Sequence, residues 1–234
     1  MLAVFKRELG AYFTSPLGYV FISIFYIFSG YFLYVFTLQP GTTDISGVFT
    51  MMFYIMMIFI PVLTMRLMAD DKRQKTDQLT LTAPISLMRL VFGKFLSAFS
   101  VFGIAVLIMP VYAIVLSGFG SVNWTYIWGN VLGMLLMGAV FISAGIFVST
   151  LTENQMVAAI GGMAVNLLIL LIDTLASIIP VEFISNVFIS LSFFNKYMQI
   201  TLGIFSLSNV IFFASAITIF LFLTVRVLEK RRWA

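Results

Sequence analysis

The sequence predicts an all-α, polytopic membrane protein of six transmembrane helices with both termini in the cytoplasm. Hydrophobic residues make up 62% of the 234-residue chain and charged residues only 9%, whereas soluble domains have about 45–50% apolar residues. Because lipid offers the backbone no hydrogen-bond partners, such a chain must form helices or a closed barrel. Long unbroken apolar runs favour helices, since roughly 20 residues at about 1.5 Å each cross the hydrocarbon core.

The apolar stretches and the basic residues between them predict the topology. The expected spans are Leu17–Leu38, Val48–Met65, Phe95–Leu116, Tyr126–Leu151, Met156–Ile179 and Leu207–Val225. Short cytoplasmic loops carry an excess of Lys and Arg. Of the 13 basic residues, all but Lys196 precede the first span, lie between the second and third, or follow the last. Both termini and the loop after the second span are therefore expected in the cytoplasm.

Two further segments differ from ordinary loops. Apolar residues at helical spacing line one face of residues 1–16, which predicts an amphipathic helix in the membrane interface. Residues 180–206 are expected outside the cell, yet they are dense in Phe, Ile, Leu and Met. One or two short helices that dip into the outer interface would explain this composition, and so would a lipid-anchored loop without a gating role.

The loop at residues 66–94 is the most informative segment. Seven of the twelve residues from Arg66 to Asp77 are charged, and three of these are acidic. The added acids, and a helical turn that Thr76 or Asp77 can cap, predict an ordered elbow of mixed charge. Leu79 in this turn could insert into a groove of a partner. A solvated turn beside the membrane is the simpler interpretation of the same loop.

Three segments resemble the ABC type-2 exporter permeases, and among them the gliding-motility-like permease subunits. They are FKRELGAYFTSPLGYV (5–20), MRLMADDKRQKTDQLTLTAPIS (65–86) with the following Gly93 and Lys94, and STLTENQMVAA (149–159). The resemblance covers nearly the whole chain and implies one ABC type-2 transmembrane domain over residues 1–234. It implies that residues 1–16 are a connecting helix and that the other two segments dock on an ATPase subunit.

The resemblance also implies partners and functional residues. The expected ATPase-coupling residues are Asp70, Asp71, Lys72, Arg73, Thr76, Asp77, Gln78, Leu79 and Glu153. A separate ABC ATPase subunit and a second permease chain, identical or related, are the expected partners in the inner membrane. ATP and Mg²⁺ are expected on that ATPase, with no cofactor or metal on this chain. The sequence contains no GxxxxGK[ST] loop, so this chain is not expected to be an enzyme.

Composition limits the other functions. The chain has neither Cys nor His, which removes disulfides, thiolate or imidazole metal sites and triads with a His base. Lipid head groups account for basic residues beside the spans, so nucleic acid is not an expected partner. An ATP-independent secondary transporter, or a membrane anchor that transports nothing, remains as the alternative function.

Polar residues inside the spans are candidates for a substrate path. Asn166 and Asp173 share one face of the fifth span with small residues, and an acid in hydrocarbon is costly. Asp173 could instead reach the outer surface or pair with a neighbouring helix. Tyr26 and Tyr34 share one face of the first span, where a packing seam is the alternative. Such a path would suit lipids, peptides, drugs or polymer precursors alike.

Overall fold

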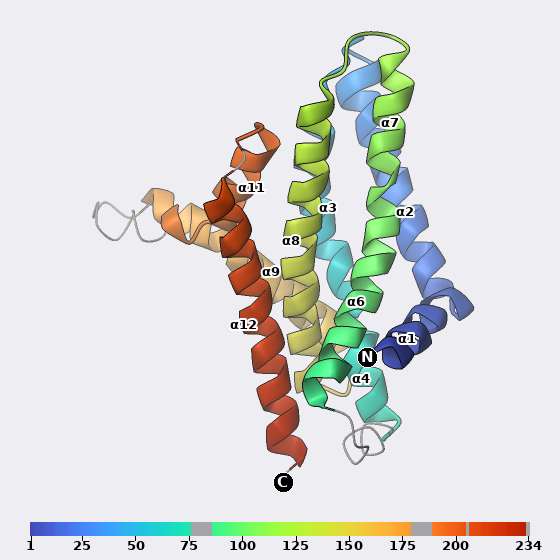
Figure 1. The fold of residues 1–234 in the computed structure, drawn as a ribbon, viewed down its shortest axis with the longest axis vertical. Coiled ribbons are helices and arrows are strands. Elements are labelled where there is room, and N and C mark those ends of the chain that lie inside the picture. Colours follow the sequence, from blue (N-terminus) through green and yellow to red (C-terminus); the bar gives the residue numbers. More distant parts are fainter. Residues whose placement is uncertain (76–85, 179–188, 205, 233–234) are drawn as a thin grey trace.

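In the computed structural model the chain is a bundle of helices, with no strand among the described residues (Figure 1). The structure describes residues 1–75, 86–178, 189–204 and 206–232, and only the backbone of residues 173–178. The helices are α1 (Leu2–Thr14), α2 (Pro16–Leu33), the π-helix η1 (Tyr34–Leu38), α3 (Ser46–Thr64), α4 (Arg66–Arg73), α6 (Leu87–Val106), α7 (Ile108–Ser117), α8 (Trp124–Leu151), α9 (Gln155–Ile178), α11 (Phe193–Thr201) and α12 (Leu207–Arg232).

Six helical segments in the described part of the chain are long and apolar enough to cross a membrane, which confirms the predicted number. They are Pro16–Leu38, Ser46–Arg73, Leu87–Ser117, Trp124–Leu151, Gln155–Ile172 and Leu207–Arg232. Several run past the predicted ends into charged sequence, because the hydrogen bonds inside a helix do not require lipid. The second span thus continues through α4, and the third begins at Leu87 rather than Phe95.

Two segments predicted outside the spans are also helical. The expected amphipathic helix within residues 1–16 is α1, which lies crosswise near the lower end of the bundle and packs on α6 (Figure 1). The described part of residues 180–206 contains α11, whose Tyr197 and Ile200 are buried. Tyr197 donates a hydrogen bond from its hydroxyl to the carbonyl of Phe49 in α3 (3.1 Å). Since α11 is bonded to the interior of the bundle in this way, it is an integral part of the fold.

Helix α8 forms the centre of the bundle. Within its most apolar stretch 78% of the residues are buried, compared with 28% in the corresponding stretches of α2, α9 and α12. Glycines allow neighbouring helices to approach closely, and at Gly138 an added Cβ would overlap the buried ring of Phe102 in α6. Helices α2, α9 and α12 lie at the periphery, where their exposed apolar side chains suit contact with lipid.

A proline in α3 explains how α9 is attached. Pro61 has no amide hydrogen, so the carbonyl of Met57 lacks the partner that an α-helix would supply. The side chain of Asn166 in α9 donates its Nδ2 hydrogen to that carbonyl (3.0 Å). Gly162, one turn earlier in α9, lies so near Pro61 that a Cβ there would be 2.9 Å from the proline Cβ. Gly162 and Asn166, two members of the predicted polar and small face of this span, therefore pack on α3.

The two ends of the bundle differ in chemistry. Both termini and α4 lie at one end, the lower end in Figure 1, which we name the terminal end. The connections after η1 and after α7 meet at the opposite end, where Thr43 donates from its hydroxyl to the carbonyl of Ser121 (3.3 Å). The basic residues of α4 and of the last turn of α12 gather at the terminal end.

Replacing Gly138 with Ala should destabilise the protein. The new Cβ would lie 2.6 and 2.9 Å from Cζ and Cδ1 of Phe102, and overpacking of this kind costs roughly 1–3 kcal/mol. Gly103→Ala is the matched control, because nothing lies within 4 Å of a Cβ at that helical position. Thermal unfolding in detergent should give a lower midpoint for Gly138→Ala alone. Equal midpoints for the two variants would contradict the packing described for α8.

Candidate functional site

A buried lysine organises the terminal end of the bundle. Lys94 of α6 is only 1% exposed, and its Nζ lies 2.6 Å from Oδ2 of Asp71 in α4 and 3.2 Å from Oε1 of Glu8 in α1. It also donates a hydrogen bond to the carbonyl of Leu67. A buried ammonium group is stable only when it is paired and hydrogen-bonded. Lys94 therefore connects α6, α4 and α1, which are distant from one another in the sequence.

A second cation balances the two acids. The guanidinium of Arg7 lies 2.5 Å from Oε1 of Glu8 and 3.9 Å from Oδ2 of Asp71. The hydrogen bond to Glu8 raises the pKa of Arg7, the attraction of both carboxylates adds to this, and partial burial opposes it. Arg7 thus stays charged, and it forms with Glu8, Asp71 and Lys94 a group of two basic and two acidic side chains. We refer to these four residues as the ion cluster.

Tyr12 attaches α1 to the membrane part of the bundle. Its hydroxyl donates to the carbonyl of Leu63 in α3 (2.8 Å). Burial raises the pKa of this phenol, so the hydroxyl keeps the proton that it donates. The guanidinium of Arg66 lies 5.7 Å from the centre of the Tyr12 ring and donates to the hydroxyl of Ser15 (2.8 Å). Helix α1 is therefore fixed to both α3 and α4.

Helix α4 is also bonded to the turn between α8 and α9. Lys72 pairs with Glu153 (3.1 Å), and the side-chain amide of Gln155 donates to Oδ1 of Asp70. Asp70 pairs with Arg73 one turn further along α4 (3.3 Å). The contacts of Glu153 and Gln155 with α4 join two segments that lie some eighty residues apart in the sequence.

One serine fixes the bend between α3 and α4. Ser149 of α8 donates its hydroxyl to the carbonyl of Met65 (2.8 Å). The same oxygen accepts hydrogen bonds from the amides of Met68 (3.2 Å) and Ala69 (3.0 Å). A side chain inserted among the backbone hydrogen bonds of a helix is a recognised cause of a bend. The direction of α4 relative to α3 is thus set by α8.

Comparison with known families decides the identity of this charged, six-span bundle. A family model described as "ABC-2 family transporter protein" matches residues 2–233. The chain belongs to the ABC-2 transporter family. No curated protein matches it. Family membership and the six apolar helices together indicate a multi-pass transporter permease, and permeases of this family generally dimerise and work with an ABC ATPase.

The ABC-2 protein brings together the described members of the predicted coupling set. Asp70, Asp71, Lys72 and Arg73 lie on α4, and Glu153 lies opposite them. Their exposure separates them into two groups, because Arg73 and Glu153 are each 63% exposed whereas the other three are 22–23% exposed. The exposed pair is open to a partner, and the other three face the protein. The remaining members of the set, Thr76, Asp77, Gln78 and Leu79, lie outside the described residues.

The structure adds residues that the sequence did not single out as a site. Lys94, Ser149 and Gln155 bind α4 from three other elements, and Glu8 of α1 shares Lys94 with Asp71. A signal for Lys94 is present in the sequence, since it interrupts the apolar run VFGKFL and a charge in such a run needs a partner. The signal does not say which acids are its partners, because these are distant in the chain.

The predicted path residues of this permease have varied surroundings. Asn166 is buried and bonded to α3 as described above. Tyr26 donates from its hydroxyl to the carbonyl of Ile104 in α6 (3.3 Å). Tyr34 is 58% exposed on the periphery, and the side chain of Asp173 lies outside the described residues. The contacts of Asn166 and Tyr26 are helix-packing contacts, and a substrate path along these four residues stays a prediction.

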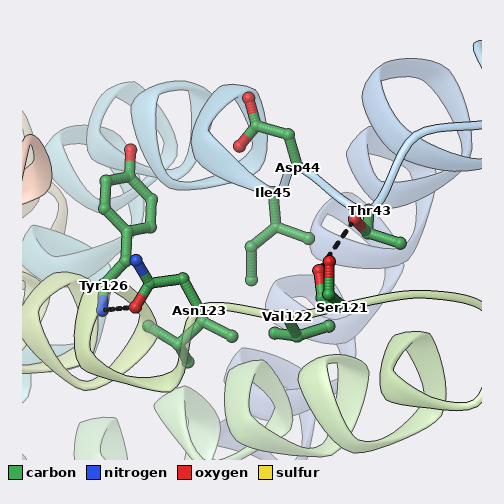
Figure 2. Close-up of a pocket in the computed structure, with 8 residues that line it drawn as sticks. Thr43, Asp44, Ile45, Ser121, Val122, Asn123 and Tyr126 are labelled. Carbon is green, nitrogen blue, oxygen red and sulfur yellow. Dashed lines mark hydrogen bonds between the residues drawn. The ribbon is translucent and has the colours of Figure 1, made fainter.

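A polar pocket at the opposite end consists largely of turn and capping groups (Figure 2). Its volume is about 390 Å³, and it is lined by Thr43, Asp44, Ile45, Ser121, Val122, Asn123, Tyr126 and Ile127. The carboxylate of Asp44 accepts from the amide (2.9 Å) and the hydroxyl (2.8 Å) of Ser46. The side-chain oxygen of Asn123 accepts from the amide of Tyr126 (3.2 Å). These polar groups stabilise the starts of α3 and α8.

Replacing Lys94 with Met should strongly destabilise this permease. The change leaves Glu8 and Asp71 without their common cation, and removing one partner of a buried ion pair costs roughly 3–5 kcal/mol. Lys230→Met is the control, because Lys230 is exposed. Denaturant unfolding in detergent should show the loss for Lys94→Met alone. Adding Glu8→Gln and Asp71→Asn should restore part of it, and a Lys94→Met protein of unchanged stability would contradict the role given to this cluster.

Proposed function

We propose that this chain is the membrane-spanning permease subunit of an ATP-driven exporter, with the ATPase on a separate subunit. The observation that carries the proposal is the attachment of α4, which pairs with Arg7 of α1, with Lys94 of α6 and with the turn before α9. Family membership supports the transporter class. In the proposed arrangement two permease chains form the pathway in the inner membrane, and two ATPase subunits dock at the terminal end.

The proposal requires that a displacement of α4 is transmitted to the membrane-spanning helices. Helix α4 continues the second span without a gap beyond Met65, so a displacement at α4 acts directly on α3. The bond between Gln155 and Asp70 passes the same displacement to the first turn of α9. Because paired charges with low exposure hold their geometry better than solvated ones, α4 and its neighbours move together.

The coupling residues differ in exposure, and we assign different roles to the exposed and the less exposed side chains. Arg73 and Glu153 project into solvent and are the proposed contacts with the ATPase, together with Thr76, Asp77, Gln78 and Leu79 in the same loop. Asp70, Asp71 and Lys72 face the bundle and transmit the displacement inward. ATP and Mg²⁺ bind the ATPase subunit in this proposal, and closure of the two ATPases tilts the second and fifth spans.

The proposed outcome of this tilt is a cavity between the two permease chains that opens to the outside and releases the substrate. Asp173, Asn166, Tyr26 and Tyr34 are the proposed path residues on this chain. Their hydroxyl, amide and carboxyl groups in an otherwise apolar setting suit an amphipathic substrate.

A complex with an ATPase should be recovered when the tagged permease is purified from its native membranes in a mild detergent. The complex should hydrolyse ATP and contain a chain with a GxxxxGK[ST] loop, identified by mass spectrometry. The double variant Arg73→Glu with Glu153→Lys should lose most of the bound ATPase, because both exposed charges are reversed.

The control for this experiment is Ser121→Glu, which alters charge at the opposite end of the bundle. It should retain the ATPase. Recovery of the wild-type permease without any ATPase would overturn the proposed function, and full retention by the double variant would overturn the docking surface at α4.

The proposed orientation can be measured directly because the chain contains no Cys. A single cysteine at Arg73 should react with a membrane-impermeant maleimide only in inverted vesicles, where the cytoplasmic side faces outward. A cysteine at Ser121 should react only in intact spheroplasts. Labelling of both positions from the same side would contradict a membrane-spanning bundle, and the reverse pattern would place the termini outside.

A further inference from the structure

A cleft at the terminal end shares no lining residue with the ion cluster or with Arg73 and Glu153. It is formed by the first turn of α6 and the last turns of α12, and its volume is about 450 Å³. The lining residues are Ser86, Leu87, Met88, Phe222, Val225, Arg226, Glu229 and Arg232. This volume lies within the range of roughly 300–1,000 Å³ found for small-molecule sites.

The wall that α12 contributes changes from apolar to charged along the helix axis. Its lining residues recur every three or four positions, which places them on one face of the helix. Phe222 and Val225 come first, and Arg226, Glu229 and Arg232 follow toward the C-terminal end. This wall of the cleft is therefore apolar toward the middle of the span and charged toward its C-terminal end.

The charges at the outer part of the cleft have a positive excess. Arg226 pairs with Glu229 (2.9 Å) and lies 4.8 Å above the ring of Phe222. Arg232 forms no ion pair with any residue that the structure describes. Two guanidinium groups thus face one carboxylate, and a planar guanidinium can donate two parallel hydrogen bonds to a phosphate.

The apolar part of the cleft is open to the surroundings of the bundle. Met88 is 66% exposed and Phe222 is 51% exposed, and Ile219, one turn before Phe222, is also exposed. In a membrane-spanning bundle such side chains contact acyl chains. A soluble anion would use the arginines and leave this apolar wall without a function.

We propose that the cleft binds an anionic phospholipid. The phosphate lies between Arg226 and Arg232, and the acyl chains follow Met88, Phe222 and the exposed face of α12. The graded lining matches a molecule with a charged head and an apolar tail, and the positive excess favours a lipid of net negative charge over a zwitterionic one. Basic pockets between transmembrane helices are known to hold such head groups.

The test is a lipid titration of the purified full-length protein in detergent, with bound lipid counted by native mass spectrometry. Dioleoylphosphatidylglycerol should bind more tightly than dioleoylphosphatidylcholine of the same chain length. Arg232→Gln should lower the association constant for phosphatidylglycerol about fivefold, as expected for one basic residue near a lipid surface. Lys230→Gln removes the same charge from an exposed position outside the cleft and should leave the constant nearly unchanged.

Three outcomes would overturn the proposal. One is equal affinity for the two lipids, which would leave no preference for negative charge. Another is an equal loss in Arg232→Gln and Lys230→Gln, which would indicate diffuse attraction. The third is complete displacement of the lipid by inorganic phosphate, which would identify a soluble anion as the ligand. Because Arg232 has no ion pair among the described residues, its variant should keep the elution volume of the wild type in gel filtration.

Discussion

The helix formed by α3 and α4 depends on hydrogen bonds from the side chains of its neighbours. Within the part of the chain that the structure describes, five of its carbonyl groups accept a hydrogen bond from a residue of another helix, and each donor comes from a different helix. The pairs are Phe49 with Tyr197, Met57 with Asn166, Leu63 with Tyr12, Met65 with Ser149, and Leu67 with Lys94. In membrane proteins such interhelical hydrogen bonds contribute about 0.6 kcal/mol on average. Their number and spread along one helix make α3 and α4 the element to which the others are attached.

This arrangement fixes the positions of the helices in a bundle with few polar groups. The hydrophobic effect gives helices in lipid little preference for one position over another, because lipid tails are as apolar as Leu. Directional hydrogen bonds supply that preference. In this protein they converge on α3 and α4, the segment that ends in exposed charged side chains. The ion cluster adds rigidity, since Lys94 would be strongly unfavourable in any arrangement that separated it from Asp71 and Glu8.

The sequence predicts the six spans well and the bonds between them poorly. Hydrophobicity is a local property, so the run from Leu207 onward identifies α12 without any knowledge of its neighbours. The partners of Lys94 and Asn166 depend on which helices are neighbours in the bundle. No single segment of the sequence determines that arrangement. Even Pro61, whose missing amide predicts an unpaired carbonyl at Met57, does not identify Asn166 as the donor.

The ion cluster also constrains how the protein is made. Its members come from α1, α4 and α6, so Glu8 and Asp71 are synthesised well before Lys94. Until the third span has entered the bilayer, both carboxylates lack this cation and remain hydrated at the membrane surface. The contact of Glu8 with Lys94 is therefore completed only after the third span, which carries this lysine, has been inserted.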